Sequence, residues 1–515
     1  MSEDAIETDY EIGQDNVEIM GLDIHNPVFV ISGLMIIAFV LITLMFQETA
    51  GQAFNDLRPW LSKTFDWLFM GAANIFVIFC LALIVLPMGK VRIGGKDAVP
   101  EYSYPGWFAM LFAAGMGIGL MFFGVLEPVY HTLNPPLGVD AANTEAARAI
   151  GMSATIFHWG LHPWAIYAVV ALSLAYFCYN AKLPLTIRSA FHPLLGDRVW
   201  GWPGHIIDIL AVFATLFGLA TSLGFGAEQA TAGLNYLFGT PSGDGMKVFL
   251  IIAITGVALV SVLAGLDAGV KRLSELNMIL ALLLLGFVIA VGPTLNIVQG
   301  FFNGLADYAV ALPALSNWVG REDLGYMHGW TTFYWAWWIA WSPFVGMFIA
   351  RVSKGRTVRE FIVCVLIVPT LACVAWMAVF GGTAVDQYLN DGYQGVAQTV
   401  NDWQPELSLF KMLEVLPLSG ITSFIGIVLV IVFFVTSSDS GSLVIDTITA
   451  GGKLDAPVAQ RVFWCVFEGL VAITLLLGGG LGSLQALAIA TGFPFAIVLL
   501  VMCVSLFMAL RKAER

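Results

Sequence analysis

The chain has 515 residues, of which 58% are hydrophobic and 11% are charged. A soluble globular domain carries about 25% charged residues, so this composition excludes a soluble enzyme and a disordered chain. The 23 basic and 36 acidic side chains also exclude a nucleic-acid-binding protein, which needs a cationic surface for phosphates. A mean hydropathy of +0.84 and the lack of long polar linkers predict a single body embedded in a lipid bilayer.

Apolar segments of membrane-spanning length recur along the whole chain. A spanning helix needs about 20 apolar residues, and a window of that size predicts an all-α polytopic membrane protein with twelve transmembrane helices. They are expected near residues 27–46, 68–88, 105–130, 147–179, 204–238, 246–268, 272–299, 329–352, 358–384, 418–449, 458–479 and 483–510. Two further segments, 47–66 and 296–316, mix apolar and polar residues in a way that is typical of helices at the membrane surface.

Basic residues are divided unequally between the two sets of predicted loops. With the N-terminus inside, 17 of the 23 Lys and Arg side chains fall in cytoplasmic segments and 6 in outer segments, as the positive-inside rule requires. Both termini are therefore predicted to be cytoplasmic. The expected divisions are an acidic N-terminal tail (1–26), two peripheral helices with a connecting amphipathic segment (27–104), an extracytoplasmic amphipathic segment (301–328) and a short C-terminal tail (511–515).

A glycine-rich run interrupts the third predicted span. Gly115, Gly117 and Gly119 crowd one turn of the segment 113–124, where glycine weakens a helix and lets another group approach the backbone. A close helix–helix crossing is one interpretation, but glycines two residues apart are spread around a helix instead of sharing a face. We favour a locally unwound helix whose free amides and carbonyls face a ligand, as in secondary transporters.

The fourth predicted span carries three large aromatic residues on one side. At 100° per residue, Trp159, Trp164 and Tyr167 lie within about 140° of one another. Packing or an interfacial aromatic belt is the alternative, although residues in the middle of a span suit a belt poorly. His158 and His162 have the i, i+4 spacing of a metal-binding pair. No acidic or thiol partner is expected near them, which favours hydrogen-bonded structural histidines.

The eighth predicted span is unusually rich in tryptophan. Five of the 16 tryptophans of the chain fall within twelve residues: Trp330, Trp335, Trp337, Trp338 and Trp341. Core packing is the alternative, but each buried indole N–H also needs a hydrogen-bond partner. Two facing helices lined with Trp and Tyr make the site expected for a quaternary ammonium ion. Its methyl groups donate no strong hydrogen bonds, so ring quadrupoles must replace water around the charge.

Hydroxyl groups gather in the tenth predicted span, at Thr436, Ser437 and Ser438 before Asp439. Such hydroxyls often bond back to the carbonyl four residues earlier. They also offer oxygen ligands to a hard cation such as sodium, together with carbonyls freed in the glycine run. Other acidic residues near or within spans are expected to be helix-end or inter-helix partners: Asp208, Glu228, Asp446 and Glu468.

Four separated motifs, in this order along the chain, resemble the betaine/choline/carnitine transporter family, and most of all its sodium-coupled glycine betaine symporters. They are Gly-Met-Gly-Ile-Gly at 115–119, the run from His158 to Tyr167, the run from Trp330 to Phe344, and Thr-Ser-Ser-Asp-Ser at 436–440. The resemblance implies a LeuT-like five-plus-five inverted repeat, made of helices 3–7 (105–300) and 8–12 (329–510). It also implies a homotrimer in a bacterial inner membrane, without enzymatic activity and without a cofactor other than Na⁺ as coupling ion.

Residue by residue, the resemblance also implies a site. The aromatic box would be Trp159, Trp164, Tyr167 and Trp338. The substrate would pass Phe333, Trp337 and Trp341 and contact the unwound stretch at Gly115, Met116 and Gly117. The main sodium site would take backbone oxygens of Ala113, Met116 and Phe433 and the hydroxyls of Thr436 and Ser437. A second sodium site would fall near Thr221 and Phe344.

The expected function is sodium-coupled uptake of a small zwitterionic or cationic solute, with glycine betaine as the substrate that the resemblance favours. Met116, Thr436 and Ser437 match the cation site, which sodium-independent carnitine exchangers lack, so symport is favoured over exchange. Choline, carnitine, dimethylsulfoniopropionate and ectoine stay open as alternative substrates on the same fold. The chain ends soon after its last predicted span, so we expect a transport rate independent of a C-terminal osmosensor.

Overall fold

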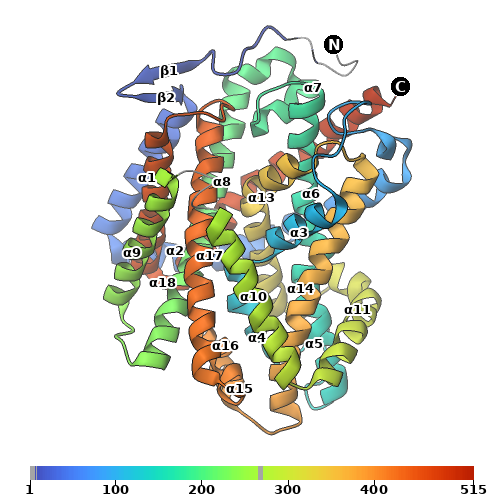
Figure 1. Ribbon diagram of the computed structural model, residues 1–515, viewed down its shortest axis with the longest axis vertical. Coiled ribbons are helices and arrows are strands. Elements are labelled where there is room, and N and C mark those ends of the chain that lie inside the picture. Colours follow the sequence, from blue (N-terminus) through green and yellow to red (C-terminus); the bar gives the residue numbers. More distant parts are fainter. Residues whose placement is uncertain (1–5, 7, 265–270, 515) are drawn as a thin grey trace.

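The computed structural model describes residue 6 and residues 8–264 and 271–514. Long helices run between two ends of the molecule, and the first and last described segments of the chain lie toward the same end, at the top of Figure 1. The last residues of the predicted span 246–268 lie outside the described part of the chain. One small sheet accompanies the helices, and it lies near the N-terminus.

The chain begins with two strands and two long helices: β1 (Asn16–Ile19), β2 (Leu22–His25), α1 (Val28–Met45) and α2 (Gln47–Val85). Helices of the next third of the chain are α3 (Tyr104–Gly115), α4 (Ile118–Leu133), α5 (Thr144–Trp159), α6 (Leu161–Ala175), α7 (His192–Leu195), α8 (Trp202–Phe238) and α9 (Asp244–Ala264). The remaining helices are α10 (Lys271–Val291), α11 (Thr294–Ser316), α12 (Leu324–Tyr326), α13 (Thr332–Val352), α14 (Val358–Leu389), α15 (Gly395–Asn401), α16 (Ser408–Glu414), α17 (Ser419–Thr449) and α18 (Val458–Ala513).

Nine helices of the described residues are long and apolar enough to cross a membrane, and a tenth span results when the bent pair α3 and α4 is counted as one. This agrees with a polytopic membrane protein. Helix α13, predicted as a span, is not among the nine, and α18 covers two predicted spans in one element. Within α18, Gly479 and Gly480 have positive φ angles of 157° and 64°, which residues other than glycine adopt only with strain.

Part of the predicted N-terminal tail is an antiparallel hairpin. Strands β1 and β2 pair Asn16 with His25 at the open end and Ile19 with Leu22 at the turn. The hairpin is fastened to the segment that joins α17 to α18, because Asn16 Nδ2 donates to the carbonyl of Ala450 at 2.9 Å and Asp23 pairs with Lys453. Contacts from the start of the chain therefore reach residues more than 400 positions later.

Two of the expected boundaries are wrong. The amphipathic segment 47–66 is not a separate surface helix, because α2 runs without interruption from Gln47 through Pro59 to Val85. The seventh predicted span, 272–299, ends eight residues early, at Val291. The following Gly292-Pro293 pair stops it, since the residue before a proline is disfavoured in the α conformation. The amphipathic segment 296–316 is the separate helix α11.

The third predicted span is broken at the glycine run, as expected. Helix α3 ends at Gly115, α4 begins at Ile118, and the two axes are bent by 66°. Between them, Met116 and Gly117 are extended, with ψ angles of 131° and −174°. The fourth predicted span is broken as well, which the sequence reading did not anticipate. Helix α5 ends at Trp159 and α6 begins at Leu161, with Gly160 at φ −98° and ψ −126°.

Helix α13 occupies the centre of the molecule. It packs against α6, α8 and α18, and every residue from Thr332 to Ala340 is buried. A π-helical turn, Met327–Thr331, leads into it without a gap. The tryptophan-rich span thus faces the breaks in the third and fourth predicted spans from inside the bundle.

Candidate substrate and sodium site

The break between α5 and α6 supplies hydrogen-bond acceptors to two tryptophans. Pro163 has no N–H group and cannot bond to the carbonyl of Trp159, four residues earlier. That carbonyl accepts instead from the indole N–H of Trp164, at 3.2 Å. The carbonyl of His158 accepts from the indole N–H of Trp338, at 2.9 Å. Carbonyls released by the break therefore orient one indole on α6 and one on α13.

The four residues of the predicted aromatic box lie together. The ring of Trp338 meets the ring of Trp159 edge to face, with centroids 4.9 Å apart, and approaches Tyr167 at 6.3 Å. Tyr167 in turn meets Trp164 at 5.2 Å. All four side chains are buried, with between 3% and 7% of their surface exposed. A cation binds over the face of an aromatic ring, and rings set at an angle to one another can turn more than one face toward the same ion.

The glycine run lies directly against this box. A Cβ atom added at Gly115 would lie 3.3 Å from Cζ2 of Trp164, and one added at Gly119 would lie 2.7 Å from Cη2 of Trp159. A Cβ atom at Gly117 would meet no atom within 4 Å. Glycine is thus required for close approach at position 119, whereas the backbone at position 117 faces open space beside the box.

The two helix ends at the break carry opposite partial charges. The C-terminal end of α3 has free carbonyls and a negative dipole end, and the N-terminal end of α4 has free N–H groups and a positive one. No side chain caps α4 at Gly117. The N–H groups that open α4 are consequently available to an anionic group of a ligand.

Glu127 is a site residue that the sequence reading left without a role. Its Oε2 accepts from the indole N–H of Trp159 at 2.7 Å and from the hydroxyl of Tyr334 at 2.6 Å. Its Oε1 lies 2.5 Å from Nδ1 of His158, whose Nε2 lies 2.9 Å from the Thr331 hydroxyl. The expectation that His158 has no acidic partner is therefore wrong, because α4 brings one from 31 residues away. A carboxylate inside a span is itself a signal of function, and Glu127 gave that signal.

His158 and His162, the predicted histidine pair, are each hydrogen-bonded to another side chain. Glu127, His131 and His158 present ligand atoms within 4.8 Å of one another. The 2.5 Å between Glu127 and His158 is shorter than the roughly 3.3 Å that separates two ligands of one tetrahedral zinc ion with bonds of about 2.0 Å. Glu127 and His158 thus belong to a hydrogen-bond network that holds Trp159, while His131, 3.4 Å from Glu127, has no hydrogen-bond partner among the described residues. The other histidine of the predicted pair, His162, bonds to Asn74 at 2.9 Å.

Three predicted pathway residues lie on α13 beside the box. Trp337 stacks on Trp338 with centroids 4.7 Å apart and on Phe333 at 5.4 Å. Its indole N–H donates to the carbonyl of Gly218 on α8. Trp341 is partly exposed and meets Phe344 edge to face at 4.9 Å. Phe333 and Trp337 thus pack in the core against α8, while Trp341 lies one turn further along.

The predicted sodium ligands lie in two segments, the break after α3 and the middle of α17, and both segments contact α8. Ile118, directly after the break, and Phe434 on α17 both lie against Gly226 of α8. The Thr436 hydroxyl donates to the carbonyls of Val432 at 3.0 Å and Phe433 at 3.2 Å, the local bonding that was the alternative to ion binding. Among the described residues, no hydrogen bond joins Ala113 or Met116 to Phe433, Thr436 or Ser437.

Two further observations concern cation binding. Asn277 on α10 was not singled out, yet its amide donates to the Thr436 hydroxyl at 3.4 Å and the side chain is buried. At the second predicted sodium site, the Thr221 hydroxyl donates to the carbonyls of Phe217 and Leu484, and the ring of Phe344 packs on Trp341. In the described part of the chain, no hydrogen bond joins Thr221 to Phe344.

The other acidic residues near or within spans have partners on neighbouring segments, as expected. Asp208 pairs with Arg188, Glu228 with Lys247, Asp446 accepts from Gln460, and Glu468 accepts from Ser438. Asp439, four residues into the hydroxyl motif, pairs with Arg461 of α18 and accepts from Ser261 of α9 at 2.5 Å. These ion pairs and hydrogen bonds join helices to one another.

Comparison with known proteins gives one consistent result. Residues 27–515 match the model of the BCCT family, described as betaine/carnitine/choline family transporters. The chain is 61% identical to a glycine betaine/proline/choline transporter of Vibrio parahaemolyticus, over 99% of this chain and 95% of the relative. It is 57% identical to glycine betaine transporter 1 of the same organism, over 99% and 98% of the two chains. It is 44% identical to a glycine betaine transporter of Acinetobacter baylyi, over 94% and 73%. The chain is a multi-pass membrane transporter, not an enzyme, and it belongs to the BCCT family.

Proposed function

We propose that this protein imports a quaternary-ammonium solute, glycine betaine foremost, together with sodium. The observation that carries the proposal is the anchored aromatic box. The indole N–H groups of Trp159, Trp164 and Trp338 donate to the Glu127 carboxylate and to the main-chain carbonyls of Trp159 and His158, respectively, which fixes the rings. A trimethylammonium group among desolvated rings gains about 2 kcal/mol from cation–π attraction. The names of the relatives agree with this substrate class.

The carboxylate of the solute has a place in the same proposal. It would lie at the open space beside Gly117, where the uncapped N-terminal end of α4 offers N–H groups. A helix N-terminus favours an anion by its dipole and by its unpaired donors. Glycine betaine carries both charges, so its ammonium group would lie in the aromatic box and its carboxylate at the N-terminal end of α4.

Sodium would bind between the end of α3 and the middle of α17. The proposed ligands are carbonyl oxygens of Ala113, Met116 and Phe433 and the hydroxyls of Thr436 and Ser437. For this the Thr436 hydroxyl must turn its lone pairs to the ion and share its bond to the carbonyl of Val432. Each positive charge that moves inward gains about 2.3 kcal/mol per 100 mV of membrane potential, which drives uptake against a gradient. The second sodium site, at Thr221 and Phe344, belongs to the same proposal.

We infer the finer architecture from membership of the BCCT family. Adding α13 to the ten spans, and dividing α18 at Gly479 and Gly480, gives twelve. The proposed division is an inverted repeat of five and five helices, covering 105–300 and 329–510, in a homotrimer of the bacterial inner membrane with both termini in the cytoplasm. Alternating access would follow from one repeat-derived bundle rocking against the rest.

Uptake by proteoliposomes is the direct test. Radiolabelled glycine betaine is added with an inward sodium gradient, with equal sodium on both sides, or with potassium in its place. The proposal requires accumulation only with the sodium gradient, and equal uptake in potassium would refute symport. Competition by unlabelled proline, choline, carnitine, dimethylsulfoniopropionate and ectoine then ranks the substrates, since one relative's name includes proline and choline.

Sodium-independent exchange is the second candidate function. The observation that favours it is the Thr436 hydroxyl, which is already satisfied by the carbonyls of Val432 and Phe433. An exchanger would take up labelled solute without sodium, but only into proteoliposomes preloaded with unlabelled solute. Uptake that needs preloading and ignores sodium would select this function.

A further inference from the structure

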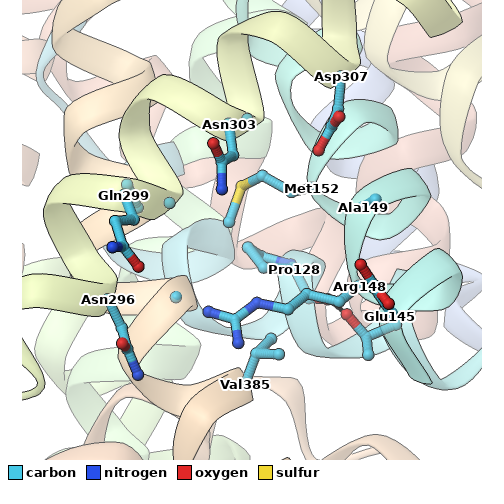
Figure 2. Close-up of a pocket in the computed structure, with 15 residues that line it drawn as sticks. Pro128, Glu145, Arg148, Ala149, Met152, Asn296, Gln299, Asn303, Asp307 and Val385 are labelled. Atoms are coloured by element: carbon cyan, nitrogen blue, oxygen red, sulfur yellow. Dashed lines mark hydrogen bonds between the residues drawn. The ribbon is translucent and has the colours of Figure 1, made fainter.

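A polar cavity lies apart from the aromatic box, between α5, α11 and α14, with α4 as its floor. Its volume is about 430 Å³, enough for a small organic molecule. Figure 2 shows side chains of α11 entering it from one side and Glu145 and Arg148 of α5 from the other. None of the described residues that line it is aromatic, which distinguishes it from the box.

Helix α11 presents a continuous polar stripe to this cavity. Asn296, Gln299, Asn303 and Asp307 follow one another at intervals of three and four residues, so they share one face of the helix. Leu295 and Phe302 are exposed beside this stripe, by 69% and 64%, and Val310, seven residues after Asn303, is exposed in line with it, by 83%. An amphipathic helix at a membrane surface ordinarily turns its polar face to water. In α11 the polar stripe borders the cavity: Asn296 and Asp307 are half-buried there, while Gln299 and Asn303 are exposed, so the cavity is open to solvent on this side.

The opposite wall carries charges that are only partly paired. Arg148 Nη1 donates to Asp386 Oδ1 at 2.6 Å. The second oxygen, Asp386 Oδ2, is buried and has no hydrogen-bond partner among the described residues. Arg148 uses only that one nitrogen in a hydrogen bond in the same part of the chain. With Glu145, Asp307 and Asp386 against Arg148, the cavity and its rim hold two more negative charges than positive ones.

Glycines keep the cavity open. A Cβ atom added at Gly300 of α11 or at Gly382 of α14, both of which line the cavity, would meet no atom within 4 Å. At Gly304 the added atom would lie 3.2 Å from Cγ of Met152. The space is therefore bounded at one point, where α11 touches α5, and free at two others.

We propose that this cavity binds a small zwitterion with a primary or secondary ammonium group. Such an ammonium donates N–H bonds to the carboxylates and to the amide oxygens of α11, and the anionic end of the ligand pairs with the remaining donors of Arg148. A quaternary ammonium donates no such bonds and finds no ring here, so this cavity selects against the ligand that suits the aromatic box. The ligand is a free amino acid such as proline, or the ethanolamine headgroup of a membrane lipid, since each combines such an ammonium with an anionic group.

Equilibrium dialysis of the purified full chain in lipid-free detergent tests the proposal. The probes are radiolabelled proline, glycerophosphoethanolamine and glycerophosphocholine, each with saturating glycine betaine present to occupy the aromatic box. We expect proline or glycerophosphoethanolamine to bind and glycerophosphocholine not to bind. Proline alone assigns a free amino acid, glycerophosphoethanolamine alone assigns a lipid headgroup, and binding of neither overturns the proposal.

The variant Gly300→Leu should fill the cavity and reduce this binding at least tenfold. Gly286→Leu is the matched control, because Gly286 on α10 also has no atom within 4 Å of an added Cβ but lies away from the cavity. Binding that survives in Gly300→Leu would place the ligand elsewhere and overturn the proposal. Glycine betaine binding should be unchanged in both variants. The difference between them does not depend on whether the aromatic box holds betaine, so this test and the uptake test fail independently.

Discussion

Trp338 and His158 lie 180 residues apart in the sequence, and the indole N–H of one donates to the main-chain carbonyl of the other. This bond joins the central helix α13 to the break between α5 and α6. The Trp338 side chain, which we propose to contact the substrate, is thus held by a backbone carbonyl that would accept an intrahelical hydrogen bond in an unbroken helix.

Replacing Trp338 with leucine should weaken glycine betaine binding about 30-fold, because a lost cation–π contact of about 2 kcal/mol corresponds to that factor. Isothermal titration with glycine betaine in saturating sodium measures it. Trp464→Leu is the matched control: Trp464 is also fully buried with one indole bond, to Thr449 at 3.0 Å, but lies on α18. Equal losses in the two variants would mean that both tryptophans are only structural.

Glu127→Gln should weaken betaine binding about tenfold. One carboxylate accepts from Trp159, Tyr334 and His158, whereas an amide has one acceptor oxygen and turns its NH₂ toward another donor. Trp159 then loses its fixed orientation. Glu468→Gln, a fully buried carboxylate on α18 with Ser438 as partner, should bind betaine as the wild type does. An unchanged affinity in Glu127→Gln would show that Trp159 needs no anchor.

Two alanine substitutions in the glycine run should differ in what they affect: one should lower the stability of the protein, and the other its affinity for betaine. Gly119→Ala places a Cβ atom 2.7 Å from Trp159, an overpacking that costs about 1–3 kcal/mol, so the melting temperature of the substrate-free protein should fall by several degrees. Gly117→Ala meets nothing within 4 Å and should leave that temperature unchanged. Its betaine affinity should nevertheless fall, since the added methyl group enters the space proposed for the carboxylate. Unchanged affinity would place the carboxylate elsewhere.

Thr436→Ala and Ser437→Ala should each raise the sodium concentration for half-maximal uptake at least tenfold, since each removes one proposed oxygen ligand. Thr447→Ala is the control on the same helix, because the Thr447 hydroxyl also bonds to a carbonyl four residues earlier, at 2.8 Å. Initial uptake rates against sodium concentration decide the matter. An unchanged sodium dependence in both variants would show that the ion does not bind at α17.

The hairpin β1–β2 should detach from the segment between α17 and α18 in acid. Burial alone would raise the pKa of the Asp23 carboxyl, but hydrogen bonds from Lys453 and Asn16 outweigh it and leave the pKa below its ordinary value. A lowered pKa stabilises the folded form above the unfolded value of about 3.9, and this contribution disappears as the pH falls through the folded pKa.

Hydrogen–deuterium exchange of residues 16–25, corrected for intrinsic rates, measures this detachment. Asp23→Asn should exchange faster than the wild type at pH 7 and equally fast at pH 3. Glu11→Gln, at an exposed position, should match the wild type at both. A difference between Asp23→Asn and the wild type that persists at pH 3 would show that the charge is not responsible.

The features that the sequence predicts best are those with local causes. Three glycines at alternate positions are enough to predict the break after Gly115, and the density of tryptophan predicts an aromatic centre. The residues of the box lie together as expected. The early end of α10 also has a local cause, the Gly292-Pro293 pair, and a stricter reading would have found it.

Features that depend on distant partners were not predictable in this way. Nothing local announces that Glu127 on α4 will meet His158 on α5, because the two helices must first be packed. The continuity of α2 through Pro59 has the same origin: a proline inside a helix usually ends it or kinks it, and here contacts with the surrounding helices decide. The π-helical turn before α13 is likewise tertiary in origin, whereas the break at Gly160 has a local signal in Gly160 and Pro163.

The break between α3 and α4 has a consequence for energetics. Its carbonyl end and its amide end are separated by only Met116 and Gly117, so a cation held by the first and an anion held by the second would be near neighbours that attract each other. By thermodynamic reciprocity, the bound cation would raise the affinity for the anion by the same factor as the bound anion raises the affinity for the cation. A pair of interrupted helix ends can thereby act as a coupling element without any moving part between the two ligands.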